Sequence, residues 1–220
     1  MRPLWFPGLM RLDPAGWPFI GGALLVALLA GAAIAWILAI PFVVLGLFFL
    51  FFFRDPERVS PADADAVLSP ADGKVIIAGA ALADAAPPPG PAAWQQISIF
   101  LSPMDVHVNR IPATGRVTRV TFSPGKFLPA YRHDAGGANE RSEVWIDHAG
   151  QTVVARQIVG MLARRVVCRA SVGDEVRAGD RFGIMKFGSR MDIFLPLTAQ
   201  ITVTAGQMVR GGETIIAVLH

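Results

Sequence analysis

The chain has 220 residues, 53% of them apolar, and a formal net charge of +3. That length allows one domain of ordinary size, or a smaller domain with an appendage. The apolar excess lies at the N-terminal end, which favours the second arrangement. Lysine and arginine are scattered rather than gathered in patches with aromatic residues. This pattern suits an anionic membrane surface at least as well as nucleic acid, and we expect no nucleic-acid partner.

The first predicted element is an apolar segment, residues 1–53, which has no charged residue from Gly16 to Phe53. About twenty apolar residues can cross the hydrocarbon core as a helix, so we predict membrane association. Pro41 interrupts the stretch. Arginines stand on both sides of it: Arg2, Arg11, Arg54 and Arg58. Because basic flanks tend to stay cytoplasmic, a hairpin or an even number of crossings is favoured over one span.

A cleaved secretory signal is the competing interpretation of this segment. The apolar run is much longer than the core of a signal peptide, and no small-x-small cleavage site follows it. The single cysteine, Cys168, cannot form an internal disulfide, which fits a reducing compartment. We therefore expect residues 54–220 on the cytoplasmic side of the cell membrane. Cys168 itself is interpreted as a small buried hydrophobic residue.

Residues 54–220 are predicted to form a mainly β (α+β) domain. Short β-branched runs alternate with glycine, proline and aspartate clusters. The expected strands are 96–101, 116–122, 143–147, 152–159 and 200–204. Two loops are expected, 83–93 with four prolines and the glycine-rich 123–139, which holds His133. His148 and His220 look like a turn and a terminus, and no ligand cluster with metal spacing is present, so we predict no metal.

Two sequence patterns recur within this domain. Pro-Ala-Asp-Gly-Lys-Val at 70–75 returns as Pro-Ala-Thr-Gly-Arg-Val at 112–117, and Gly-x-x-Val-x-x-Gly at 173–179 returns at 206–212. Each pattern is a turn that leads into a strand. The pairs predict a β-sandwich or barrel-like hybrid with approximate internal symmetry.

Three segments carry the chemical signal: Ser-Pro-Ala-Asp-Gly-Lys-Val at 69–75, Phe-Leu-Ser-Pro-Met-Asp-Val-His-Val-Asn-Arg at 100–110, and Ile-Met-Lys-Phe-Gly-Ser-Arg at 184–190. Any one alone would be weak, since Asp-Gly and Gly-Ser are ordinary turn pairs and a single histidine is often structural. In this order, behind an apolar N-terminus, they closely resemble the short-form phosphatidylserine decarboxylase proenzymes. The resemblance covers essentially the whole chain and implies a carboxy-lyase of phospholipid biosynthesis.

The resemblance implies that the chain cuts itself between Gly188 and Ser189. Ser189 would be the nucleophile, with His107 as its base and Asp72 as the group that orients the histidine. Gly188 suits this role because a residue without Cβ permits a strained turn and close approach. The products would be a β chain of residues 1–188 and an α chain of residues 189–220. These two chains would remain together as a heterodimer, and higher oligomers are left open.

The implied cofactor is a pyruvoyl group made from Ser189. The amine of phosphatidylserine would form a Schiff base with it, lose carbon dioxide and leave as phosphatidylethanolamine, with His107 as a plausible proton donor. Phosphatidylserine and membrane lipids are thus the expected partners. A serine ether lipid of the archaeal type remains an alternative substrate.

Two positions depart from the longer branch of the family. Arg110 stands where that branch tends to carry a second histidine, which places the base role on His107. Arg190 replaces the usual threonine after the serine, as is normal in the short branch.

A membrane-tethered biotinyl or lipoyl carrier domain is the alternative from another functional class. Its hammerhead presents a lysine on a tight hairpin, and Lys186 lies about twenty residues before the second Gly-x-x-Val-x-x-Gly copy. A carrier requires neither the Asp72 and His107 segments nor a Gly-Ser pair, and a shared architecture does not imply a shared function.

Overall fold

The computed structural model describes residues 11–81, 86–87, 93–132, 134–161 and 165–220. The chain forms two compact units, Met1–Glu57 and Arg58–His220. His133 and Arg2 lie outside the described residues. Of the predicted loop 83–93, only residues 86, 87 and 93 are described.

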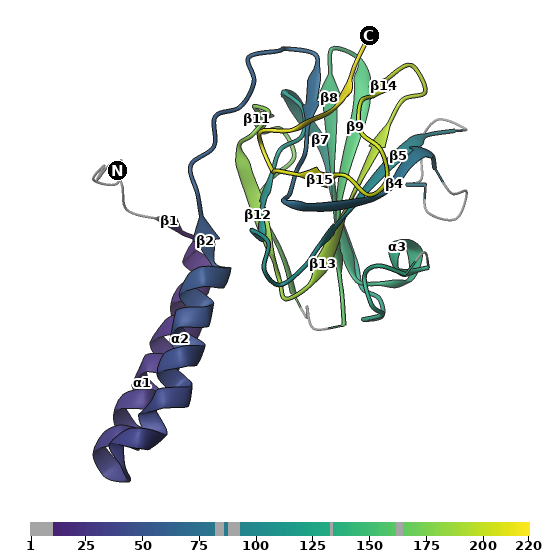
Figure 1. Ribbon diagram of the computed structural model, residues 1–220. Coiled ribbons are helices and arrows are strands. Elements are labelled where there is room, and N and C mark those ends of the chain that lie inside the picture. Colours follow the sequence, from purple (N-terminus) through teal and green to yellow (C-terminus); the bar gives the residue numbers. More distant parts are fainter. Residues whose placement is uncertain (1–10, 82–85, 88–92, 133, 162–164) are drawn as a thin grey trace. The chain divides into compact units, whose positions relative to one another are not determined.

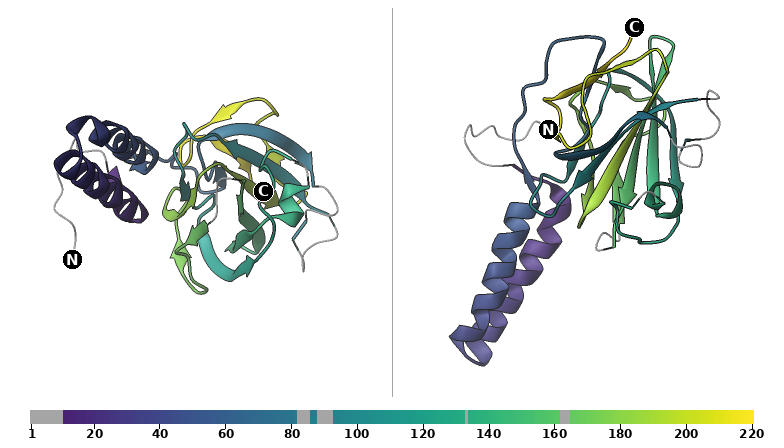
Figure 2. Two further views of the ribbon diagram at one scale, coloured as in Figure 1. Left: turned by 90° about the horizontal axis from the view of Figure 1, so that it is seen from below. Right: turned by 45° about the vertical axis from the view of Figure 1, so that its right-hand side comes forward.

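The first unit is a helical hairpin. Its elements are β1 (Arg11–Leu12), the 3-10 turn Pro14–Gly16, α1 (Trp17–Ala33), the 3-10 turn Trp36–Ala39, α2 (Ile40–Phe52) and β2 (Arg54–Asp55). Figures 1 and 2 show α1 and α2 side by side, and the rings of Phe19 and Phe49 meet edge to face, 5.4 Å apart. Pro41 does not break α2, because it lies in the first turn, where its missing N–H is not needed.

The length and the ends of this hairpin bear on the membrane prediction. The segment Pro14–Ala33 is long and apolar enough to cross a bilayer, while Trp36–Phe52 is shorter. The short strands β1 and β2 pair antiparallel, with Leu12 opposite Arg54, so the two ends of the hairpin meet. The helical hairpin has the shape that the flanking arginines predict, and its position in a membrane stays a prediction.

The second unit is built mainly from strands, which confirms the predicted fold class. Its elements are β3 (Ala66–Leu68), β4 (Gly73–Ala80), β5 (Gln95–Leu101), β6 (Val108–Arg110), β7 (Gly115–Ser123), α3 (Ala135–Ala138), β8 (Arg141–His148), β9 (Gln151–Val159), β10 (Arg165–Cys168), β11 (Glu175–Val176), β12 (Arg181–Lys186), β13 (Ser189–Leu195), β14 (Gln200–Ile201), β15 (Met208–Val209) and β16 (Ile215–Val218). Four of the five expected strands are present with similar bounds. The fifth, 200–204, was predicted too long, because only its first two residues pair with β16.

An eight-stranded antiparallel sheet organises this unit, in the order β11-β7-β8-β9-β13-β5-β4-β15. The sheet curls into a half-barrel (Figures 1 and 2). Two three-stranded sheets, β10-β12-β6 and β14-β16-β3, accompany it. The central position of β13 matters for the site, because every residue of that strand from 189 to 194 has a partner on both sides.

The two predicted repeats occupy equivalent places at the two edges of the large sheet. Gly73 pairs with Val209 at one edge, and Gly115 pairs with Val176 at the other. A Cβ on either glycine would collide with a carbonyl of the neighbouring strand, so the backbones approach too closely for any other residue. The internal symmetry suggested by the sequence is therefore present in the backbone pairing.

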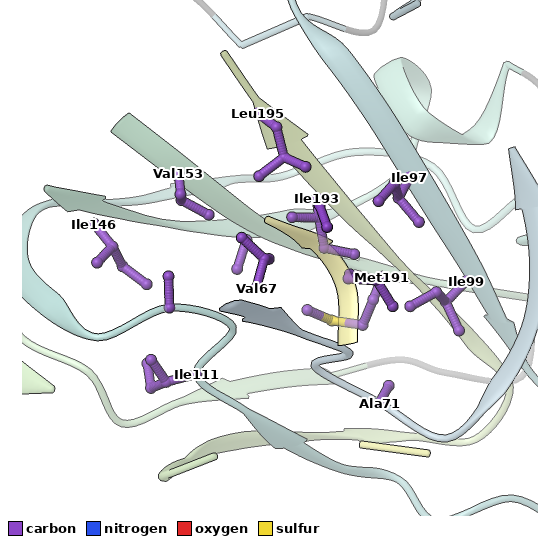
Figure 3. Packing of buried hydrophobic residues seen from close by; sticks show 14 of the residues in the cluster. Val67, Ala71, Ile97, Ile99, Ile111, Ile146, Val153, Met191, Ile193 and Leu195 are labelled. Carbon is purple, nitrogen blue, oxygen red and sulfur yellow. The ribbon is translucent and has the colours of Figure 1, made fainter. Parts of the chain in front are cut away.

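The hydrophobic core lies on the concave side of the curled sheet. Figure 3 shows Met191, Ile193 and Leu195 of β13 among the isoleucines of β5, all fully buried. Their spacing of two residues is that of a strand with one face on the core. Each such side chain contributes roughly 1.5–3 kcal/mol when buried. By the same period Ser189, two residues before Met191, lies on the core side at the beginning of β13.

Candidate active site

The Gly188-Ser189 pair lies where β13 begins. Ser189 is fully buried, and it is paired with Leu101 at the end of β5 and with Val159 at the end of β9. Its Oγ makes no hydrogen bond with any residue that the structure describes. A buried hydroxyl without a partner is costly, so such a group requires an explanation beyond packing.

The carbonyl of Gly188 is held by the next strand. The Gly160 amide donates a hydrogen bond of 3.1 Å to the Gly188 oxygen, which extends the β9–β13 ladder by one residue. Gly188 has φ of +70°, a conformation that glycine adopts without strain. A Cβ on Gly160 would lie 2.5 Å from the Gly188 oxygen. Gly160 therefore has to be glycine for its amide to reach this carbonyl.

His107 is fully buried and lies just before β6. Its Nδ1 lies 3.0 Å from the backbone oxygen of Asp105. Because a carbonyl only accepts, this hydrogen bond requires the proton on Nδ1 and leaves Nε2 as the basic nitrogen. Leu101, the last residue of β5, pairs with Ser189, and the loop that follows Leu101 leads to His107.

The loop that carries His107 is fixed by its own side chains. Asp105 accepts hydrogen bonds of 2.8 Å from both the amide and the hydroxyl of Ser102, and its amide donates 3.0 Å back to the Ser102 oxygen. This reciprocal turn holds the Asp105 carbonyl that orients His107. The Ser-x-x-Asp spacing in the sequence is a local signal for such a turn.

Asp72 lies at the start of β4, in a different set of contacts. Its carboxylate accepts a hydrogen bond of 2.8 Å from the Arg58 guanidinium and one of 2.7 Å from the amide of Gly211. Arg58 also contacts Glu213 at 3.1 Å. The structure thus brings Asp72 to the turn after β15, and its contact with His107 stays a prediction.

Residue 190 anchors the strand behind the serine. Arg190 is fully buried and forms a two-pronged ion pair with Asp192, at 2.6 and 2.9 Å. It also donates a hydrogen bond of 3.2 Å to the Ser98 hydroxyl on β5 and one of 3.1 Å to the carbonyl of Arg132. These bonds lie on the convex side of the sheet and fix the residue that follows Ser189.

A second buried pair extends this polar layer. Arg156 contacts Glu143 with two bonds of 2.8 Å. Burial lowers the pKa of the Arg156 guanidinium from its ordinary value, and the nearby Glu143 carboxylate opposes that shift. On the exposed loop outside, the hydrogen bond between Arg132 and Asp134 raises the pKa of the arginine and lowers that of the aspartate.

The predicted loop 123–139 covers this polar layer. It contains the short helix α3, and Asn139 closes it by donating 2.8 Å to the carbonyls of Leu128 and Val159. Since Val159 pairs with Ser189, the loop is tied directly to the strand beside the site.

The remaining predicted positions have structural surroundings. Arg110 is buried and donates a hydrogen bond of 3.0 Å to the carbonyl of Gly179. It therefore holds the turn that ends the first Gly-x-x-Val-x-x-Gly pattern, 173–179. Cys168 is half-buried and packs against the core, less completely than expected. His148 ends β8 before a turn, and His220 is exposed. Within the described residues, no group of three metal-ligating side chains is found.

Comparison with known proteins defines the class. A family model described as phosphatidylserine decarboxylase matches residues 45–217. Three curated relatives, each named phosphatidylserine decarboxylase proenzyme, align over 93% of the chain. They come from Granulibacter bethesdensis (46% identity, 84% of the relative covered), Nitrosomonas europaea (42%, 94% covered) and Chlorobium phaeobacteroides (42%, 98% covered). These matches identify the chain as a carboxy-lyase.

The chain belongs to the phosphatidylserine decarboxylase family, which confirms the resemblance found in the sequence. The carrier-domain alternative is not favoured. Lys186 ends β12 in register with Arg165 of β10, so it continues a sheet instead of standing at an exposed hairpin tip.

Proposed function

We propose that the chain is a phosphatidylserine decarboxylase that cuts itself between Gly188 and Ser189 and works with a pyruvoyl group derived from Ser189. The observation that carries this proposal is the buried Ser189 hydroxyl, which has no hydrogen bond and directly follows a carbonyl held by the Gly160 amide.

The first step is an acyl shift. His107 Nε2 takes the hydroxyl proton while Ser189 Oγ attacks the Gly188 carbonyl carbon. The oxygen of that carbonyl becomes negative, and the Gly160 N–H already points at it, as an oxyanion donor must. The peptide C–N bond then breaks, the Ser189 nitrogen is protonated, and an ester joins Gly188 to Oγ.

Elimination completes the cleavage. Loss of the Ser189 α-proton breaks the Cβ–Oγ bond and releases the Gly188 carboxylate. The dehydroalanine that remains at 189 takes up water and loses ammonia, which leaves a ketone on the α chain. Asp72 stays in the proposed triad by resemblance, and its contacts with Arg58 and Gly211 give it a second role in holding the turn after β15.

The residues around position 189 fit the pyruvoyl group. Position 189 is enclosed, and Arg190 anchors the residue that follows the new chain end. When formed, the group supplies an electrophilic carbonyl for the substrate amine and takes up the electrons left by carbon dioxide. His107, whose Nε2 can both accept and return a proton, is the proposed proton donor to the product carbon.

We also propose that α1 and α2 anchor the enzyme in the cell membrane, with the β domain on the cytoplasmic side. Supporting this, the hairpin ends meet at β1 and β2, and Ile34 and Trp36 at its tip are each 74% exposed. Phosphatidylserine is then available in the same bilayer.

The proposed function predicts two chains in the purified protein. Intact-mass spectrometry should find one chain that ends at Gly188 and another that begins at residue 189. Only the second should react with a hydrazide probe, because only it carries a ketone. An active enzyme recovered solely as the uncut 23.5 kDa chain would contradict the proposal.

Gly160→Ala is expected to block maturation. Its Cβ would displace the Gly188 carbonyl, and loss of one oxyanion donor typically costs about 10²- to 10³-fold in rate. The measurement is the rate of chain splitting, followed by gel after synthesis in a cell-free system. As a control for folding, the substitution is also placed in Ser189→Ala, where cleavage cannot occur, and the melting temperatures are compared. Cleavage of Gly160→Ala at the parent rate would exclude this role.

A further inference from the structure

Of the nine large apolar side chains that are exposed among the described residues of the β domain, five lie at one end; the other four are Val59, Val172, Leu197 and Met208. Among the described residues of this domain, the aromatic side chains that are most exposed all lie there. We call the following set the site-end surface: Met104 (64% exposed), Phe122 (60%), Phe127 (41%), Tyr131 (63%) and Met161 (62%). They come from three separate connections, after β5, around the β7–β8 loop and after β9.

The pairing of the strands places these connections at the end where Ser189 lies. β5 and β9 end beside the residue with which β13 begins. β7 ends at Ser123, which pairs with Arg141 at the start of β8. Arg141 also pairs with Ile158, near the end of β9, so the end of β7 lies at the same end of the sheet. The ring of Tyr131 meets that of Phe100 on β5 edge to face at 6.1 Å. In Figure 1 this end of the sheet is the lower one, marked by α3.

The surface combines apolar and basic side chains, as surfaces that bind membranes do. Tyr131 has the amphipathic ring that is enriched at the boundary between lipid and water. Exposed basic side chains accompany them: Lys126 lies in the β7–β8 loop and Arg165 begins β10, while the nearby Arg132 is paired with Asp134. Such groups are attracted to anionic lipid, while the apolar side chains gain from leaving water. Neighbouring exposed apolar residues from several loops commonly mark an interaction site.

We propose that the site-end surface docks into the interface of an anionic phospholipid bilayer, so that the head group reaches residue 189 without the lipid leaving the membrane. This proposal rests on the proposed function for its substrate. The substrate argues for a bilayer over a protein partner, because a diacyl lipid cannot readily cross water to a buried site.

Leu197 provides a matched control. It is 62% exposed, like Met161, but it follows the other end of β13. The seven residues of that strand span about 20 Å at roughly 3.3 Å per residue. A domain docked by its site end therefore keeps residue 197 in water while residue 161 enters the lipid.

The test uses the full chain with Cys168→Ala, into which Met161→Cys, Met104→Cys or Leu197→Cys is introduced and labelled with an environment-sensitive fluorophore. Each protein is reconstituted into vesicles of phosphatidylcholine and phosphatidylglycerol, with or without brominated acyl chains. We expect brominated lipid to quench the labels at positions 161 and 104 and to leave the label at 197 unchanged.

Equal quenching at 161 and 197, or none at any position, would overturn the docking surface. A blue shift at 161 without quenching would mean that protein, and not lipid, covers this face, which also overturns it. Chain splitting is measured by mass on the same samples. Failure of self-cleavage with quenching intact would reject the proposed function alone, and the reverse would reject the docking alone.

Discussion

Ser189→Ala is expected to remain a single chain of 220 residues and to release no carbon dioxide from phosphatidylserine. The substitution removes one oxygen from a fully buried side chain that makes no hydrogen bond among the described residues, so the fold should lose little stability. The proposed cleavage loses its nucleophile and the cofactor loses its precursor. Both effects are complete, and no residual rate is expected in either assay.

Ser98→Ala is the matched control for this experiment. Ser98 is also a fully buried serine, on the neighbouring strand β5, but its hydroxyl accepts from Arg190 and Gln96. It should lower stability by about 1–3 kcal/mol, the usual cost of leaving buried donors unsatisfied. It should still split into two chains. If Ser189→Ala were cut at residue 188, another nucleophile would have to act.

His107→Ala should show the second largest effect, a loss of about 10⁶-fold in the rate of self-cleavage, as is measured when the base of a serine-protease triad is removed. The Asp105 carbonyl fixes the imidazole with Nε2 basic, so the ring is prepared to accept one proton. His107→Gln, which keeps polarity without a base, should be equally slow. Normal splitting of either variant would remove His107 from the proposed mechanism.

Asp72 allows its two proposed roles to be separated. Asp72→Asn keeps an oxygen for the Gly211 amide but weakens the ion pair with Arg58. If Asp72 orients His107, this variant should split more slowly than Arg58→Gln, which loses the same ion pair. If Asp72 only holds Arg58, then Arg58→Gln should reproduce its whole effect, including the loss of stability. Identical behaviour of the two variants would therefore reject Asp72 as a member of the triad.

The sequence predicted the elements whose signals are local. The alternation of β-branched residues found the central strands, and the repeated glycines found the two sheet edges because close backbone approach leaves no other choice. The strand predicted at 200–204 was too long because β-branched residues continue past Ile201, whereas pairing with β16 stops there. The extent of pairing depends on the partner strand, which local propensity does not show.

The candidate site divides in the same way. Ser189 and His107 were predicted from the resemblance of their motifs. Both are fully buried, and their roles stay predictions. The Gly160 amide and the Asp105 carbonyl were missed because they act through the backbone. Their side chains give no chemical signal, and only the register of β9 against β13 shows which amide meets the Gly188 oxygen.

The central place of β13 has a consequence for how the processed protein would come apart. After the proposed cut, the α chain contributes a strand that is hydrogen-bonded on both sides by β5 and β9 of the other chain. Nine side chains of the α chain, three of them on β13, also belong to the core, so the fragment cannot leave without opening the domain. Unfolding would then separate two molecules whose reunion depends on their concentration, although the precursor folds as one. Cleavage thereby converts a reversible fold into one that dilution makes irreversible, with a lifetime set by its unfolding rate.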